Sequence, residues 1–316
     1  MSDNSVFHEG ELLVQNKLGV AEDVAKFAPR AIRDFMPDQH RSFYQMLPMI
    51  IMGVLDDQGQ PWATAAFGQR GFMHSPDNRT LQIGALPVLH DHLNLQINPK
   101  DKLGFVGIEL ETRRRNRMNG VIGRVTDHGL TVTVDQSYGN CPQYIQRRDV
   151  NLHASMPDAQ TIVQSQSMSA DAQIIIEAAD TFFIASRTPD IGDDPRSGID
   201  ASHRGGHPGF VKVTEEGRLV FPDFSGNRFY NTLGNIAADG RVGMFLPEFE
   251  TGRAVFLTGR AEIIWDGPEV DNFMGAERLV MVDPMSVVVV ENVLPLRGDL
   301  VEPWPLLKNT GSWTGA

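Results

Sequence analysis

The chain has 316 residues, of which 41% are hydrophobic and 22% charged, so it can bury a sizeable core as a globular protein does. Its 28 basic and 40 acidic residues give a formal net charge of -12, which argues against general binding to nucleic acid or to an anionic membrane surface. The single cysteine excludes an intramolecular disulfide and a cysteine-based metal cluster.

The amino-terminal sequence is polar and acidic, unlike a secretory signal, and apolar runs such as residues 46–55 are too short to cross a bilayer. We therefore expect a soluble, cytoplasmic protein. Residues 1–40 are predicted to form a helical arm with amphipathic helices at 10–20 and 22–36. A helix at 37–47 and two strands at 49–57 and 61–67 follow, and the short β-branched runs beyond them indicate a β-barrel.

The second half of the sequence repeats the order of the first. "GFMHSPDNRTLQI" at Gly71 matches "GFVKVTEEGRLVF" at Gly209, and "KLGFV" at 102–106 matches "RVGMF" at 241–245. "GRV" at 123–125 matches "GRA" at 259–261. Three matches in the same order predict two copies of one β-rich domain, at 41–150 and 169–316, joined by a polar linker at 151–168. Ser169 is the predicted N-cap of a helix that opens the second copy.

The two copies differ in polar residues. When they are aligned with an offset of 137, Ser202, His203 and Arg204 fall over Ala65, Ala66 and Phe67. A predicted helix after residue 226 carries a line of polar residues on one side, and the matching helix predicted over 90–98 lacks that line. The line consists of Arg228, Asn231, Thr232 and Asn235.

This polar cluster, together with Lys212, is a set of hydrogen-bond donors suited to a phosphate ester. A helix amino terminus near Asn227 would add backbone N–H groups. No Walker loop or dinucleotide-binding fingerprint is present. The alternative is that these groups cap the helix and pair with local carboxylates such as Asp200 and Asp223.

The segments at 200–213, 217–245 and 252–264 resemble the pyridoxamine-phosphate-oxidase-like family of FMN-binding split barrels. The segments "FHEGELLVQNKLGV" and "QSYGNCPQYIQRR" resemble its tandem, two-barrel branch. The resemblance implies a mainly β chain with flanking helices, built as a tandem repeat of two Greek-key split barrels. It also implies an FMN at the seam between the barrels. Because only the second copy carries the polar cluster, we predict at most one FMN per chain, bound by the second copy, and a degenerate site in the first copy.

By position in that family, Arg204 and Lys212 match the strand residues that grip the FMN phosphate. Asn231 and Thr232 fall where the oxidases carry an Arg-Lys pair, and Arg228 is a candidate for the missing charge. Ser202 completes the predicted phosphate shell. His203 or Arg204 is the candidate donor to the pyrimidine edge of the flavin.

Other residues have weaker patterns. The stretch "ETRRRNRMNG" at 111–120 is predicted to be a charged hairpin loop, with the alternative that it reaches the flavin of the second copy. Gln136 and Ser137 are similar candidates for contact with the flavin. Cys141 is more typical of structural packing than of a nucleophile. His90 and His92 are more typical of surface residues than of metal ligands, so no metal site is predicted.

We expect an FMN-dependent oxidoreductase with a small-molecule substrate that the sequence does not identify and an electron donor such as NAD(P)H. The alternative is a flavin- or haem-binding carrier or sensor without turnover. No nucleic-acid or membrane partner is expected, and a homodimer is left open.

Overall fold

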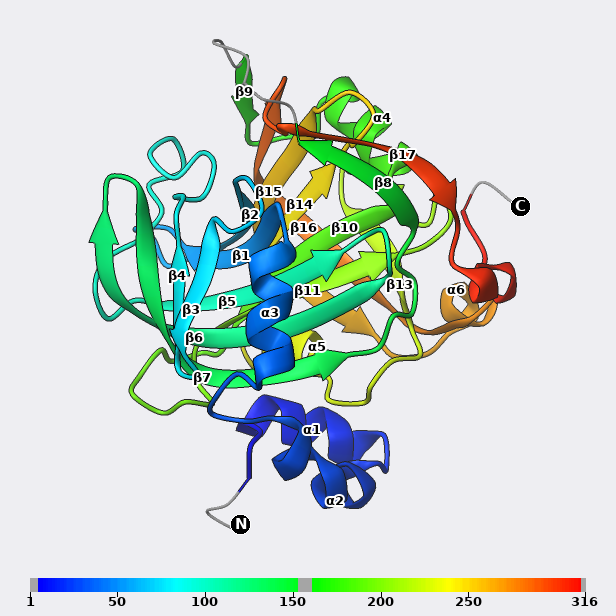
Figure 1. Ribbon diagram of the computed structural model, residues 1–316. Helices are drawn as coiled ribbons and strands as arrows, with labels where there is room; N and C mark the ends of the chain where they lie inside the picture. Colours follow the sequence, from blue (N-terminus) through cyan, green and yellow to red (C-terminus); the bar gives the residue numbers. More distant parts are fainter. Residues whose placement is uncertain (1–4, 153–160, 314–316) are drawn as a thin grey trace.

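The computed structural model describes residues 5–152 and 161–313 (Figure 1). Two of its helices form the predicted amino-terminal arm, and α4 begins after Ser169, whose hydroxyl accepts a hydrogen bond from the backbone N–H of Ala172. The helices are α1 (Glu9–Lys17), α2 (Ala21–Ala31), α3 (Asp38–Met46), α4 (Ala170–Ala178), α5 (Asn231–Ala238) and α6 (Pro268–Asp271), with a 3₁₀ helix η1 (Pro305–Asn309).

The first half forms a seven-stranded antiparallel sheet in the order β2-β1-β5-β6-β7-β4-β3. Its strands are β1 (Met49–Leu55), β2 (Pro61–Phe67), β3 (Met73–Asp77), β4 (Thr80–Ile83), β5 (Lys102–Glu109), β6 (Arg114–Thr126) and β7 (Gly129–Asn140).

The second half forms a sheet in the order β11-β10-β14-β15-β16-β13-β12. Its strands on this path are β10 (Thr181–Arg187), β11 (Ile199–Gly205), β12 (Lys212–Val213), β13 (Leu219–Phe224), β14 (Arg241–Pro247), β15 (Ala254–Ile264) and β16 (Ala276–Val290).

The two sheets therefore have the same strand order, with β1 corresponding to β10 and each later strand to its counterpart in sequence. In each sheet the third and fourth strands pair beyond the seventh, which is a Greek-key connection. The predicted fold class, a mainly β chain of two Greek-key split barrels in tandem, is confirmed.

The pairing registers give the exact correspondence between the copies. Ile51 pairs with Ala65 on β2 and with Val106 on β5, while Phe183 pairs with His203 on β11 and with Phe245 on β14. His203 therefore occupies the place of Ala65. The offset of 137 is therefore wrong by one residue, and such a slip would place each side chain on the opposite face of the strand.

Two equivalent glycines mark where the barrels approach each other. A Cβ on Gly104 of β5 would lie 2.4 Å from the carbonyl oxygen of Ile199, at the start of β11. A Cβ on Gly243 of β14 would lie 2.2 Å from the carbonyl oxygen of Pro61, at the start of β2. Each barrel thus uses one glycine to admit the backbone of the other, and the two halves pack as a pseudo-symmetric pair.

Three further described strands lie outside these two seven-strand paths. The ribbon of β8 (Arg147–Leu152) and β17 (Leu296–Glu302) joins the end of the first half to the end of the second. β9 (Ile162–Ser165) pairs with β16. The linker predicted over 151–168 is therefore partly strand at both ends, and its part at 153–160 lies outside the described residues.

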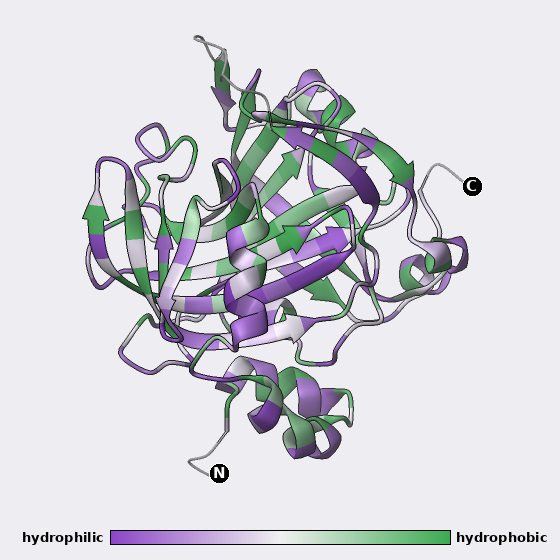
Figure 2. Cartoon of the chain, in the orientation of Figure 1, coloured by the Kyte–Doolittle hydropathy of each residue, from purple (hydrophilic) through white to green (hydrophobic). Residues whose placement is uncertain are grey.

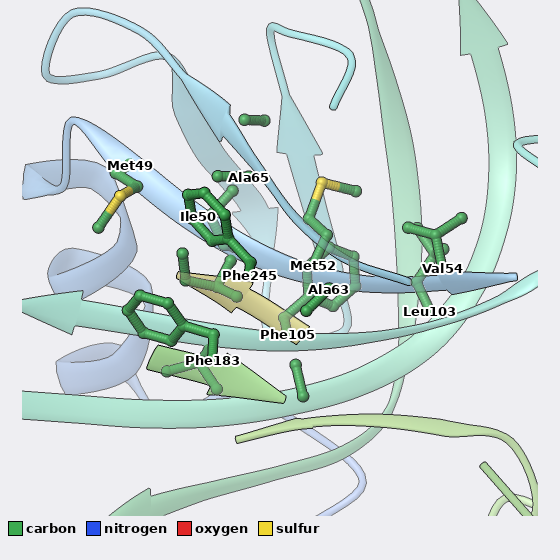
Figure 3. Close-up of a cluster of buried hydrophobic side chains, with 14 of the residues drawn as sticks. Met49, Ile50, Met52, Val54, Ala63, Ala65, Leu103, Phe105, Phe183 and Phe245 are labelled. Atoms are coloured by element: carbon green, nitrogen blue, oxygen red, sulfur yellow. The ribbon is translucent and has the colours of Figure 1, made fainter. Parts of the chain in front are cut away.

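The largest hydrophobic core spans both barrels. Figure 3 shows Met49, Ile50 and Met52 of the first barrel beside Phe183 and Phe245 of the second. In contrast to this core, the start of β6 is hydrophilic, as Figure 2 shows to the right of α3.

Two further points concern the helices. The helix predicted over residues 90–98 is wrong, because residues 88–94 form turns in which Leu89 and Asn94 have positive φ angles, and no helix follows them over 95–98. Among the described residues, no helix has the length and apolar character needed to cross a membrane.

Candidate functional site

A partly open cavity of about 100 Å³ lies at the seam between the barrels, and we call it the seam cavity. The first barrel supplies β6 and residues 140–144, and the second supplies the end of β11, residues 222–230 and the start of α5. Four arginines and one carboxylate are among its lining residues: Arg115, Arg117, Arg204, Arg228 and Asp223. The excess of positive charge is typical of an anion site.

Arg115 and Arg117 reach the cavity from the first barrel. They lie two residues apart on β6, so their side chains share one face of the strand. Burial, together with the charges of Arg204 and Arg117, lowers the pKa of Arg115 to about 10. Because a guanidinium stays charged in proteins, this shift shows that the surroundings of Arg115 favour an added negative charge.

His203 is a neutral donor at this seam. Nη1 of Arg115 donates to its Nδ1 over 3.0 Å, because a guanidinium can only donate. Burial and the neighbouring Arg115 and Arg204 hold the pKa of His203 well below its usual value, so the proton of the neutral ring is on Nε2. His203 is only 6% exposed, and its Nε2 has no hydrogen-bond partner among the described residues.

Arg204 pairs with a carboxylate inside the cavity. Its Nη1 donates to Oδ1 of Asp223 over 2.6 Å, and Arg278 donates to Oδ2 of the same carboxylate over 3.2 Å. Nε of Arg204 is buried and has no partner in the described part of the chain. The pairing with Asp223 is the alternative weighed from the sequence, and it leaves one donor of Arg204 for a ligand.

The polar side of α5 is largely satisfied by protein partners. Asn231 accepts a hydrogen bond from Nη1 of Arg117 over 2.8 Å and donates to Glu11 of the arm. Asn235 donates to Asp200 over 2.8 Å and does not line the cavity. Thr232 lies at the cavity wall, where its hydroxyl donates to that of Ser202 over 3.0 Å.

Two non-glycine residues before α5 have backbone strain. Arg228 and Tyr230 line the cavity and have φ angles of 64° and 60°, in the left-handed region that such residues rarely adopt. Strain of this kind persists only where the surrounding structure holds it.

The counterpart of the seam cavity in the other half is apolar. The registers place Ala254 and Phe256 of β15 where β6 has Arg115 and Arg117. Ala65 takes the place of His203, and all three of these apolar residues belong to the shared core. The pseudo-symmetric position therefore has neither the charges nor the donors of the seam cavity.

Three predicted cofactor residues do not line the seam cavity. Lys212 is exposed, with its Nζ 5.4 Å from the centre of the Trp313 ring. Ser137 is buried, and its Oγ lies 2.9 Å from Nδ1 of His40. Nε2 of Gln136 donates a hydrogen bond to the carbonyl oxygen of Val6. The other six predicted residues do line it: Ser202, His203, Arg204, Arg228, Asn231 and Thr232.

The weaker candidates have mixed outcomes. Cys141 lines the seam cavity, although no described contact gives it a role. His90 lies in a turn against Asp91, and the described ranges contain no cluster of three metal-ligating side chains. The stretch 111–120 is mostly strand rather than loop, and its Arg115 and Arg117 line a cavity shared with the second copy. Contact of this stretch with a flavin stays a prediction.

No protein-family model and no curated protein sequence matches the chain. Solved structures align with less than half of it. They include HupZ of Group A Streptococcus, with 10% identity, 43% of this chain and 97% of that chain covered, and a TM-score of 0.27. A candidate pyridoxamine 5'-phosphate oxidase of Corynebacterium glutamicum has 15% identity, 44% and 99% coverage, and a TM-score of 0.30.

The FAD binding protein of Mycobacterium smegmatis has 15% identity, 42% and 98% coverage, and a TM-score of 0.26. TM-scores of this size carry no argument about function. The fold assignment rests on the strand order of the two sheets.

Proposed function

We propose that this chain is an FMN-dependent oxidoreductase that binds the phosphate of FMN in the seam cavity. The observation that carries the proposal is a group of buried donors at one small cavity that have no hydrogen-bond partner in the described part of the chain: His203 Nε2, Arg204 Nε and Arg115 Nε. An unmade hydrogen bond of a buried donor costs about 1–3 kcal/mol, so these groups favour a ligand that accepts several hydrogen bonds. A phosphate monoester has three such oxygens and a charge that matches the excess of arginine.

The size of the cavity limits what enters it. Its volume of about 100 Å³ is below the roughly 300 Å³ of pockets that bury a whole small-molecule ligand. The phosphate fits within it, whereas the flavin ring system requires space outside it or a movement of its walls. Residues 140–144, at the end of β7 and in the loop after it, form part of the wall. Nδ2 of Asn227 donates a hydrogen bond to Oδ1 of Asn140 over 3.1 Å and links this loop to the second barrel.

The residues of the seam cavity would have two roles, to bind the phosphate and to balance its charge. Arg115, Arg204 and Arg228 would neutralise the phosphate, and the hydroxyl of Ser202 or Thr232 would complete its shell. His203 would donate from Nε2 without carrying a charge of its own. When bound, the flavin supplies transfer of electrons between a donor such as NAD(P)H and a substrate.

A titration distinguishes a phosphate grip from general flavin affinity. Binding is followed by the quenching of flavin fluorescence in the protein. We expect the protein to bind FMN with at least tenfold higher affinity than riboflavin, which lacks the phosphate. Equal affinity for the two would contradict the proposal. Reduction of the bound flavin by NADH or NADPH, followed by spectroscopy, then separates the oxidoreductase from a carrier that holds flavin without turnover.

A further inference from the structure

The wall of the seam cavity is built on a strained segment, residues 228–231, which we call the wall segment. Arg228 and Tyr230 line the cavity with positive φ angles, and Tyr230 stands at the N-cap of α5 without a side-chain capping bond. Left alone, such a segment relaxes to commoner backbone angles. Contacts elsewhere must therefore hold it.

Phe229, between these two residues, is held by the amino-terminal arm. Its ring centre lies 5.5 Å from that of Phe7 and 5.7 Å from that of Phe27, and it is 3% exposed. Its carbonyl oxygen accepts a hydrogen bond from Nε2 of the buried Gln15 over 3.1 Å. The arm thus fixes both the side chain and the backbone of Phe229.

Asn231, at the other end of the wall segment, is held by α1. The side-chain oxygen of Asn231 accepts from Arg117, so its amide nitrogen faces Glu11 and donates to that carboxyl group. Glu11 is 4% exposed and also accepts from the backbone N–H of His8. Glu11 therefore fixes the orientation of the amide that positions a cavity arginine.

Helix α1 of the arm also packs closely against α5, backbone against backbone. A Cβ on Gly10 would lie 2.3 Å from the carbonyl oxygen of Gly234, and a Cβ on Gly234 would lie 2.6 Å from the backbone nitrogen of Glu11. Val14 of α1 is fully buried in the core of the second barrel. The docked position of α1 is consequently specific, and a shift of the helix would move its contacts with Phe229 and Asn231 together.

We propose that the amino-terminal arm is a working part of the phosphate site, with Glu11 and Gln15 as positioning residues for the wall segment. Arm docking and ligand binding then stabilise each other. The inference rests on the proposed function for the identity of the ligand, but the coupling itself needs only an anion in the seam cavity. By linkage, the docked arm raises ligand affinity by the same factor by which the bound ligand raises the equilibrium constant for arm docking.

Hydrogen exchange of the full chain, measured by mass spectrometry, follows α1 and the wall segment separately. Wild type is compared with Glu11→Ala, Gln15→Ala and the control Leu13→Ala, whose side chain is 55% exposed on the same helix. Each is titrated with FMN and with orthophosphate. We expect both ligands to slow exchange in α1 of the wild type.

In Glu11→Ala and Gln15→Ala, we expect faster exchange in the wall segment without ligand and about tenfold weaker affinity for both ligands, within the usual range of coupling between sites. Leu13→Ala should match wild type. Gln15→Ala keeps the test open if Glu11→Ala fails to fold.

Three results would overturn the inference: variants that free α1 but leave ligand affinity unchanged, ligands that leave α1 exchange unchanged, or a wild type that binds neither ligand. Binding of orthophosphate without FMN would instead refute the flavin proposal, and the coupling would still be measured with orthophosphate.

Discussion

Arg115 of the first barrel donates to Nδ1 of His203 of the second over 3.0 Å, so the seam cavity depends on one residue from each half of the repeat. Their pseudo-symmetric counterparts are Ala254 and Ala65, both fully buried in the shared apolar core. One seam position is therefore polar and open, and the other is packed with hydrocarbon. A phosphate at the apolar position would be buried without partners, at a cost of several kcal/mol.

Arg204 offers the simplest test of the grip. We expect Arg204→Ala to weaken FMN binding by about 1.5–3 kcal/mol, the scale of a lost charged hydrogen bond. The fold should survive, because Asp223 keeps its pair with Arg278 and the first copy has Ala66 at the matching place. Isothermal titration calorimetry gives the affinity. Arg218→Ala, in the β12–β13 hairpin outside the cavity, is the control and should bind FMN as wild type does.

Arg117 should matter to stability as well as to binding. It joins Asp200 over 2.8 Å at a buried position, with side chains 4% and 10% exposed. Arg117→Met leaves that carboxylate without its cation, and breaking a buried pair in this way costs about 3–5 kcal/mol. Urea unfolding should show the loss. The exposed pair of Lys26 and Asp23 provides the control, and Lys26→Met should leave the unfolding midpoint unchanged; an equal effect of both substitutions would contradict this account.

The buried carboxyl of Glu11 should make stability depend on pH between about pH 5 and about pH 8. Burial, and then the charge of Asp200, raises the pKa of Glu11 from 4.5 to about 8. Its proton is bound more tightly in the folded state, so the stabilisation is complete below the unfolded pKa of 4.5 and is lost progressively as pH rises from there through the folded pKa of about 8. His8 has a pKa lowered by burial from 6.5, so it affects stability only below about pH 6.5, and the part of the fall above that pH belongs to Glu11.

The free energy of unfolding in urea should therefore fall progressively from about pH 5 to about pH 8 in wild type, level off above that, and fall less in Glu11→Gln. Glu9→Gln, which alters an exposed carboxylate on the same helix, should keep the slope of wild type. Identical slopes for all three proteins would show that Glu11 does not titrate in this range.

The repeat could be predicted from the sequence because two of its matched segments contain the glycines of the seam. "KLGFV" and "RVGMF" carry Gly104 and Gly243, which each admit the backbone of the other barrel, so both copies need glycine there. The N-cap at Ser169 was predictable for an equally local reason. Such features depend on a few residues close together in the chain.

The composition of the site was harder to predict, because it depends on register and on distant contacts. A slip of one residue placed Phe67 rather than Ala66 opposite Arg204, since the alignment contained no information on strand pairing. The dense charge of residues 111–120 predicts a loop, although the period-two spacing of Arg115 and Arg117 fits one face of a strand. The contact between Glu11 and Asn231 joins residues far apart in sequence, and neither position has a pattern that would indicate it.

The number of FMN molecules bound per chain tests the central claim most directly. Equilibrium dialysis with FMN, repeated with His203→Ala in the seam cavity and Ala65→Ser at the apolar counterpart, gives this count. We predict one site per chain in wild type, a weakened site in His203→Ala and an unchanged one in Ala65→Ser. Two equivalent sites, or a single site that is weakened by Ala65→Ser and unaffected by His203→Ala, would contradict the account.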